Sequence, residues 1–568
     1  MPRPLSRLLP IILLAMLAVS ACQKEAEPTP NPAKTTLGTT DAAPPGALEL
    51  VFPFGSEKQD WMEAVTAEFN AAGHESSSGK PIYVTLKPMG SGECMEEVRT
   101  GRIKANLVSP ASGAFIELAN AKNRTTTGKN LVEKADNLVM SPVIIAMWKP
   151  MAQAMGWPDK AIGWGDILEI AQSGEGWKKF GKPQWGKFRF GHTHPEFSNS
   201  GLISLLAEVY AANGKTRGLT REDVAKPETA TYLEEIEQAV VHYGSSTGFF
   251  GKTMFNNGPS YLSAAVMYEN MVIEATRGDY DLSMEVVAVY PKEGTFWSDH
   301  PCGVVNADWN DEEHRKAAQT FIDYLLEKPQ QERAMEFGFR PADVQVPLAA
   351  PIDEAHGVNP KEPKTTLAVP GAEVMDDILK LWNKHKKHSN VIVVLDTSGS
   401  MQEEERMPNA RLGAQEMLKL LHDEDVFSLL TFSNEMSWLS KGQPVGKKRD
   451  DLRSDIQGLF PEGRTRLYDS ILEAHRYARS ASGGNLITAI VVLTDGEDTL
   501  SKTTLTDLLR RISADENGDT VPVFTIGYST GEDQNQKLDQ IADRTRAKFF
   551  KGTPENIREV FKSISTFF

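Results

Sequence analysis

The feature that most constrains the fold is an apolar strand, Val391 to Leu395, that runs directly into an acid, Asp396. Further apolar runs follow in "DVFSLLTFS", "LITAIVVLT" and "PVFTIGYS", separated by helical patterns such as "LYDSILEAHRYAR". Strands that are apolar on both faces are typical of a parallel sheet covered by helices. We therefore predict an α/β, doubly wound, mostly parallel sheet for residues 389–568.

Acids and hydroxyls gather where two of these strands end. Ser398 and Ser400 follow Asp396 at alternate positions, and Asp495 follows the strand in "LITAIVVLT". In such sheets ligands bind beyond the carboxyl ends of the strands. Two carboxylates placed there need a cation to offset their charge. Oxygen donors suit Mg²⁺, Mn²⁺ or Ca²⁺ better than zinc, so the pattern predicts a hard divalent cation.

This region resembles the von Willebrand factor A family and its metal-ion-dependent adhesion site. The family pattern has Asp-x-Ser-x-Ser, a later Thr and a later Asp, and the matching positions are Asp396, Ser398, Ser400, Thr465 and Asp495. Arg464 stands where the family usually has a second Gly, which alters the loop or adds a cation. The resemblance implies a Mg²⁺ site, or one for Mn²⁺ or Ca²⁺, that takes an acidic group from a protein partner. An acid-capped strand followed by serine helix caps is the alternative.

The N-terminus predicts export and lipid attachment. Arg3 and Arg7 precede an apolar run that is too short to span a bilayer, so residues 1–21 are interpreted as a signal peptide. The sequence "VSAC" resembles a bacterial lipobox, which implies lipid on Cys22. A plain secretory signal cleaved near a cysteine is the alternative.

Gln23 resembles a sorting signal for the outer membrane, facing the periplasm if the cell is Gram-negative. Residues 22–47 are rich in Pro, Thr and Ala, and we expect a disordered tether.

Residues 48–388 alternate strand and helix patterns and resemble the two-lobed periplasmic solute-binding proteins. The match lies in the order of "GSEKQDWMEAVTAEFN", "GKFRFGHTHPEFSNSGLISLLAEVYA" and "AAVMYEN". The resemblance implies a cleft for a small polar or anionic solute, with candidate residues Ser56, Ser91, Ser109, Ser112, Thr193, Ser198, Ser200 and Glu269. Hydroxyls and amides at helix starts suit an anion, whereas Glu269 does not. The alternative is that the hydroxyls are only helix caps in a cleft without a ligand.

Other residues are interpreted more simply. His192 and His194, in "GHTHP", are expected to make ordinary hydrogen bonds rather than to bind a metal. Cys94 and Cys302 either form a disulfide, as export allows, or remain separate buried thiols.

The net charge and the absence of catalytic motifs reduce the number of functions that we expect. A formal net charge of −16, with no basic stripe, argues against nucleic acid as a partner. The sequence has no nucleophile or zinc-protease motif, and we do not expect an enzyme. We expect an envelope lipoprotein that binds a protein partner through its cation and has a solute-binding-like domain. The alternative is the substrate-binding receptor of an ABC-type importer.

Overall fold

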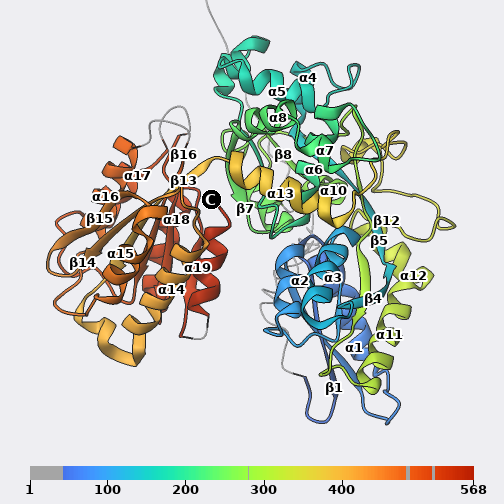
Figure 1. Cartoon of the computed structure of the whole chain (residues 1–568), viewed down its shortest axis with the longest axis horizontal. Helices are drawn as coiled ribbons and strands as arrows, with labels where there is room; N and C mark the ends of the chain where they lie inside the picture. The colour runs from blue at the N-terminus through green and yellow to red at the C-terminus, as the bar shows by residue number, and fades with distance from the viewer. Residues whose placement is uncertain (1–42, 279, 482–485, 515–518, 555) are drawn as a thin grey trace, which may run out of the picture. The chain divides into compact units, whose positions relative to one another are not determined.

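The computed structural model describes residues 43–278, 280–481, 486–514, 519–554 and 556–568. The predicted signal peptide, Cys22 and most of the predicted tether lie outside the described residues. No helix in these ranges is both long enough and apolar enough to cross a bilayer. The chain forms an N-terminal and a C-terminal α/β domain, which confirms the predicted fold class (Figure 1).

The first lobe of the N-terminal domain is built on two small sheets. Strand β1 (Leu48–Gly55) pairs in parallel with β2 (Ile82–Met89). Strand β11 (Pro301–Val305) lies antiparallel between β3 (Leu107–Val108) and β4 (Val132–Asn137). A bridge from Phe54 to Ser109 joins the two sheets. The helices of this lobe are α1 (Gln59–Ala72), α2 (Ser91–Arg99), α3 (Gly113–Thr127), α11 (Glu312–Leu326) and α12 (Lys328–Glu336).

The second lobe is built on a seven-stranded sheet in the order β10-β5-β8-β6-β7, with β9 and β12 also paired to β5. These strands are β5 (Val139–Trp148), β6 (Phe190–Thr193), β7 (Val240–Gly244), β8 (Ala264–Tyr268), β9 (Val286–Val289), β10 (Trp297–Ser298) and β12 (Arg340–Pro341). Its helices are α4 (Lys149–Ala154), α5 (Trp164–Gln172), α6 (Asn199–Asn213), α7 (Arg221–Val224), α8 (Pro227–Glu237), α9 (Thr247–Asn257), α10 (Glu269–Thr276) and α13 (Ala372–His385). Helix α13 packs on α6, α7 and α8, so it belongs to this lobe.

The chain passes between the lobes at short connections. Strand β4 ends at Asn137 and β5 begins at Val139, while β10 ends at Ser298 and β11 begins at Pro301. Asp299 and His300 therefore lie on a connection between the lobes. Polar side chains near such a connection are placed where both lobes can contact them.

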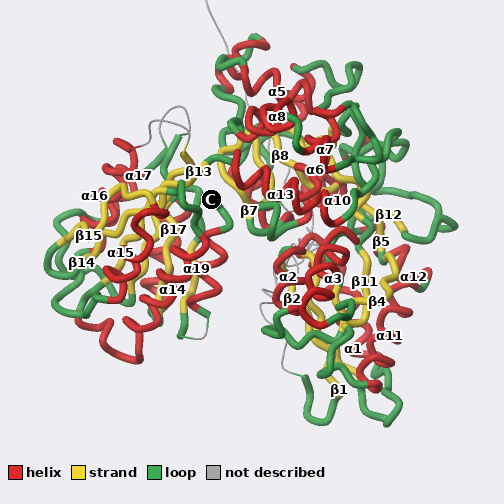
Figure 2. The backbone as a smooth tube through the Cα atoms, viewed as in Figure 1, coloured by secondary structure: helices red, strands yellow, loops and turns green. Residues whose placement is uncertain are grey.

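The C-terminal domain contains a six-stranded sheet in the order β15-β14-β13-β16-β17-β18. Figure 2 shows strands of this domain together with its helices. All pairs are parallel except β14 with β15. The strands are β13 (His388–Asp396), β14 (Val426–Phe432), β15 (Met436–Pro444), β16 (Leu486–Thr494), β17 (Val523–Tyr528) and β18 (Phe549–Gly552). The helices are α14 (Arg406–Leu420), α15 (Val445–Gln457), α16 (Leu467–Ala481), α17 (Leu505–Ile512), α18 (Glu532–Arg544) and α19 (Ile557–Ser565).

Both faces of the central strand β13 are buried, as the sequence predicts. Val391 and Val393 share a core with Met417 of α14 and Phe561 of α19. Ile392, on the opposite face, shares a core with residues of α16, α17 and α18. Burying one such side chain contributes about 1.5–3 kcal/mol, so alternation along β13 fixes the sheet between two helical layers.

Candidate metal site and interlobe cleft

The two predicted carboxylates lie at neighbouring strand ends in the C-terminal domain. Strands β13 and β16 pair in register up to Leu395 opposite Leu493. Asp396 is the last residue of β13, and Asp495 follows the last residue of β16. The parallel pairing therefore brings both acids to one edge of the sheet, as the sequence predicts.

Asp396 is fully buried and held by two hydrogen bonds. The backbone N–H of Ser398 donates to its Oδ1 at 2.8 Å, and the Thr494 hydroxyl donates to its Oδ2 at 2.6 Å. Burial raises the pKa of Asp396 to about 7, although both hydrogen bonds lower it. The ionised carboxylate is thus poorly stabilised by neutral donors alone, and a cation would stabilise it.

The three predicted hydroxyls join these acids. The Oγ atoms of Ser398 and Ser400 are 3.2 Å apart, and the Ser400 hydroxyl donates to Asp495 Oδ1 at 2.8 Å. A Cβ placed on Gly496 would lie 3.8 Å from both Ser400 Oγ and Thr465 Oγ1. The structure therefore brings together all five residues that the sequence suggested as metal ligands.

An arginine supplies positive charge at this place. Nη1 of Arg406 donates to Asp495 Oδ2 at 2.8 Å, with the Arg406 side chain 12% exposed. No pattern in the sequence indicated this contact, because Arg406 follows an exposed acidic run, Glu403 to Glu405, that precedes α14. Arg464, the cation considered from the sequence, is exposed and donates instead to the carbonyl of Thr499.

The donor set fits a hard divalent cation. It consists of two carboxylates and three hydroxyls, which are the oxygen ligands that Mg²⁺ and Ca²⁺ prefer. The guanidinium of Arg406 donates a hydrogen bond to the carboxylate of Asp495. This contact indicates that the site favours a positive charge.

In the second lobe of the N-terminal domain, predicted cleft hydroxyls form one chain at the starts of α6 and α9. Thr193 Oγ1 lies 2.8 Å from Ser200 Oγ, which accepts from Thr247 Oγ1 at 2.9 Å. Ser198 Oγ lies 3.2 Å from Thr247 Oγ1. Sequence reasoning missed Thr247, although it begins a helix after a strand as the others do.

In the first lobe, the predicted serines have separate roles. The Ser91 hydroxyl accepts from the backbone N–H of Ala111 at 2.9 Å, and Ser112 caps α3. Ser56 and Ser109 have buried hydroxyls without a hydrogen-bond partner among the described residues. Two of the four predicted serines therefore have no internal hydrogen-bond partner for the hydroxyl among the described residues.

The N-terminus of α2 is already occupied by backbone from the second lobe. The N–H groups of Gly92 and Glu93 donate to the carbonyl of Phe197 at 2.9 and 3.3 Å. A Cβ on Gly92 would lie 1.9 Å from the carbonyl oxygen of Glu196, so only glycine permits this approach. The helix end that the sequence suggested for an anion thus binds a carbonyl of the same chain.

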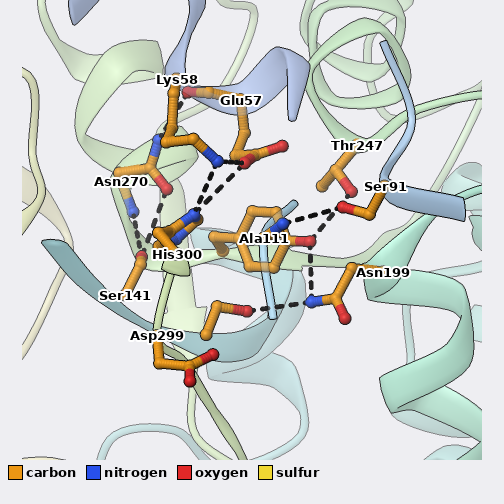
Figure 3. A network of polar contacts seen from close by, with 12 residues as sticks. Glu57, Lys58, Ser91, Ala111, Ser141, Asn199, Thr247, Asn270, Asp299 and His300 are labelled. Carbon is orange, nitrogen blue, oxygen red and sulfur yellow. Dashed lines mark hydrogen bonds and ion pairs between the residues drawn. The ribbon is translucent and has the colours of Figure 1, made fainter. Parts of the chain in front are cut away.

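A buried charged cluster, which sequence reasoning missed, lies beside these groups (Figure 3). Nζ of Lys58 donates to Glu57 Oε1 at 2.9 Å and lies 3.2 Å from His300 Nδ1. Burial would raise the pKa of Glu57, but Lys58 and His300 outweigh it and lower that pKa to about 2. The positive charge of Lys58 is therefore compensated inside the protein.

Two further buried side chains each have one polar atom without a hydrogen-bond partner among the described residues. Asn199 donates through Nδ2 to Tyr268 and Ser298, both at 3.1 Å, whereas its Oδ1 has no partner among the described residues. Nε2 of His300 also has no hydrogen-bond partner among the described residues. With the hydroxyls of Ser56 and Ser109, these atoms are buried polar groups whose hydrogen-bonding capacity is unused among the described residues.

Two family models match the chain. The model for a bacterial extracellular solute-binding protein matches residues 54–340. The chain belongs to this family. A second model, for the von Willebrand factor type A domain, matches residues 390–563. The C-terminal domain is therefore a von Willebrand factor A domain appended to a solute-binding protein domain.

Among curated proteins, inter-alpha-trypsin inhibitor heavy chain H4 of Bos taurus is 29% identical over 146 residues, which are 24% of this chain and 16% of that protein. Uncharacterized protein YfbK of Escherichia coli (strain K12) is 25% identical over 142 residues, 25% of this chain and 24% of that protein. The chain thus spans no more than a quarter of these relatives.

Solved structures include a periplasmic thiamin binding protein, with a TM-score of 0.44, 12% identity and coverage of 61% of this chain and 99% of that one. A von Willebrand factor type A protein from Catenulispora acidiphila has a TM-score of 0.28 and 22% identity, covering 32% of this chain and 43% of that one.

Glu269 has side-chain partners other than the Ser and Thr hydroxyls of the predicted cleft. Its carboxylate forms a bidentate ion pair with Arg340, at 2.8 and 2.6 Å, and also accepts from Tyr290. The carboxylate is fully buried, so this ion pair links α10 to β12 within the second lobe. Glu269 therefore has internal partners in place of a solute.

The two cysteines of the solute-binding domain do not form a disulfide with each other. Cys94 and Cys302 are free thiols, and both are fully buried. Burial raises the pKa of each thiol, which keeps both protonated at neutral pH. Of the two alternatives left by the sequence, the structure has the buried thiols.

Proposed function

We propose that this protein is a lipid-anchored envelope protein that binds a protein partner through a divalent cation held by its von Willebrand factor A domain. The anchor would be lipid on Cys22. Asp396, Asp495 and the three hydroxyls would hold the cation, whose chemistry is to provide a positive centre for a carboxylate of the partner.

The observation that carries this proposal is the convergence of two acids and three hydroxyls at one sheet edge. The pair formed by Arg406 and Asp495 adds a second consideration, because Arg406 must release Asp495 Oδ2 before that oxygen can bind a metal. Binding would thus couple the metal site to the segment that begins α14.

The test compares the full chain with its Asp396→Ala variant by Mg²⁺ titration calorimetry. We expect affinity to fall by more than about 100-fold, because a direct ligand contributes more than the outer-shell groups whose loss costs 10- to 100-fold. Asp451→Ala, which removes an exposed acid on α15, is the matched control and should change nothing. Undiminished Mg²⁺ binding by Asp396→Ala would refute the site.

Partner binding is tested separately with immobilised protein and envelope extract. Capture should require Mg²⁺, stop in chelator and be lost in Asp396→Ala. A partner that the variant captures equally well in chelator would contradict binding through the metal.

A second candidate function, solute reception for an importer, rests on membership of the solute-binding family and on the unpartnered atoms of Ser56, Ser109, Asn199 and His300. Thermal shift of the full chain against small polar metabolites and oxyanions is the test. A solute at 100 times its dissociation constant should stabilise by about 2.7 kcal/mol. If no compound shifts the melting temperature, reception is contradicted and the domain acts as a scaffold.

A further inference from the structure

We propose that His192, Glu208 and Glu237 form a second cation site, inside the solute-binding domain, of a kind that takes zinc. It is distinct from the proposed adhesion site in both domain and donor chemistry. The inference does not depend on the proposed function.

Three elements of the second lobe contribute one ligand each. His192 lies on β6, Glu208 in the middle of α6 and Glu237 at the end of α8. All three side chains have an exposed fraction of 0%. One ligand atom from each lies within 4.8 Å of the others, so small side-chain movements would bring them around one ion.

The outer contacts orient these ligands toward a common centre. Nδ1 of His192 lies 2.8 Å from the carbonyl of Thr193, and because a carbonyl only accepts, Nδ1 carries a proton. Nε2 donates to Glu237 when both ring nitrogens are protonated, and a metal would replace that proton and bind at Nε2, an arrangement common among metal-bound histidines. Nε2 lies 3.0 Å from Glu237 Oε1.

Each carboxylate has one oxygen that accepts a hydrogen bond from a hydroxyl group. Glu237 Oε2 accepts from the Tyr243 hydroxyl at 2.6 Å, which leaves Oε1 beside His192. Glu208 Oε1 accepts from the Ser204 hydroxyl at 2.9 Å. Glu208 Oε2 is buried and has no hydrogen-bond partner among the described residues.

The unpartnered oxygen of Glu208 is the observation that points to a ligand. A buried carboxylate oxygen without a partner is costly, and ion pairing or metal coordination removes that cost. Burial and the nearby charge of Glu237 raise the pKa of Glu208. A divalent cation would offset the charges of both carboxylates and use the free oxygen.

The donor set selects the metal. One imidazole and two carboxylates suit zinc, whereas the oxygen-only set of the C-terminal domain suits magnesium. Bound zinc would join β6, α6 and α8. Two of these elements carry the cleft residues Thr193 and Ser200, so the ion would hold one wall of the cleft in place.

The test uses the full chain, unfolded in chelator and refolded with and without one equivalent of Zn²⁺. Unfolding is needed because the cluster is fully buried. After gel filtration, bound zinc is measured by elemental mass spectrometry. We expect about one zinc per chain in the wild type and in Asp396→Ala, and at least a tenfold loss in Glu208→Gln and Glu237→Gln.

Glu274→Gln is the matched control, because Glu274 is also buried in the second lobe but outside the cluster. It should retain zinc. A wild type that binds no more zinc than Glu208→Gln would overturn the proposal and leave a cluster whose charges are balanced by protons.

A spectroscopic measurement keeps the test decisive if the variants do not fold. The wild type refolded with Co²⁺ should show the visible absorption of a low-coordinate site with a nitrogen ligand. Absorption no stronger than that of aqueous Co²⁺ would overturn the proposal without any variant.

Discussion

The solute-binding domain and the von Willebrand factor A domain both place buried acids beside helix starts, Glu57 in the first and Asp396 and Asp495 at a sheet edge in the second, but they balance charge differently. In the solute-binding domain, Glu57 is paired with the fully buried Lys58. At that sheet edge, the hydrogen bonds to Asp396 from the described residues come from neutral donors, and Arg406 pairs with Asp495, Glu403 and Glu404.

The difference shows how one location in an α/β fold acquires different chemistry. A carboxylate with its own buried cation stabilises the fold and leaves little charge for a ligand. A carboxylate with neutral donors is ready to bind an external cation. The local partner of the acid, rather than its position at a sheet edge, decides between these roles.

The largest expected effect comes from replacing equivalent acids in the two regions. Glu57→Gln should destabilise the protein by about 3–5 kcal/mol, because it leaves the Lys58 ammonium buried without a counter-charge. Asp396→Asn, measured in chelator, should change stability by less than about 1 kcal/mol, because it removes a poorly stabilised charge. Urea unfolding measures both. If both variants lose the same free energy of unfolding, the two acids do not differ in how their charge is balanced.

The pH dependence sharpens this prediction. The pKa of Glu57 is lowered from 4.5 to about 2, so its contribution is present at neutral pH and is lost as pH falls through that range. The stability difference between wild type and Glu57→Gln should therefore shrink between pH 4.5 and 2.

A smaller effect tests how closely the lobes approach. Gly92→Ala should destabilise by about 1–3 kcal/mol, because its Cβ would meet the Glu196 carbonyl. Gly371→Ala is the control, since a Cβ there meets nothing within 4 Å, and we expect a change below about 0.5 kcal/mol. Unfolding in urea gives both values. If the two variants are equally stable, the contact between α2 and Phe197 does not hold the lobes together.

The smallest effect concerns Arg406. Arg406→Gln should raise Mg²⁺ affinity by about 5- to 10-fold, because Asp495 no longer has to release a guanidinium. Arg464→Gln, whose guanidinium contacts the carbonyl of Thr499, should change affinity by less than about twofold. Calorimetric titration measures both. Unchanged affinity in Arg406→Gln would mean that Arg406 does not compete with the metal.

The fold class and the placement of Asp396 and Asp495 at one sheet edge could be predicted because both depend on local patterns. Apolar strands determine which residues reach the sheet edge, and Asp396 and Asp495 follow such strands directly. Ser398 and Ser400 lie within four residues of Asp396, so a short motif contains most of the proposed ligand set.

The internal ion-pair partners of the buried acids in the solute-binding domain could not be predicted in the same way. Lys58 and His300 are 242 positions apart, and nothing in the local sequence indicates that this lysine is fully buried. Glu269 and Arg340 are 71 positions apart, so the internal partner of Glu269 was equally hidden. His192 was interpreted as an ordinary hydrogen-bonding residue because Glu208 and Glu237 lie on helices far from it in sequence.

The Phe197 carbonyl at the start of α2 has a consequence for ligand selection. Because it belongs to the same chain, it acts as a tethered competitor at high effective concentration, and it cannot diffuse away from the helix end. A free solute that approaches α2 through an oxygen atom alone would therefore be displaced. A solute would have to engage further groups of the domain to replace it, so this contact would disfavour small ions that make a single contact.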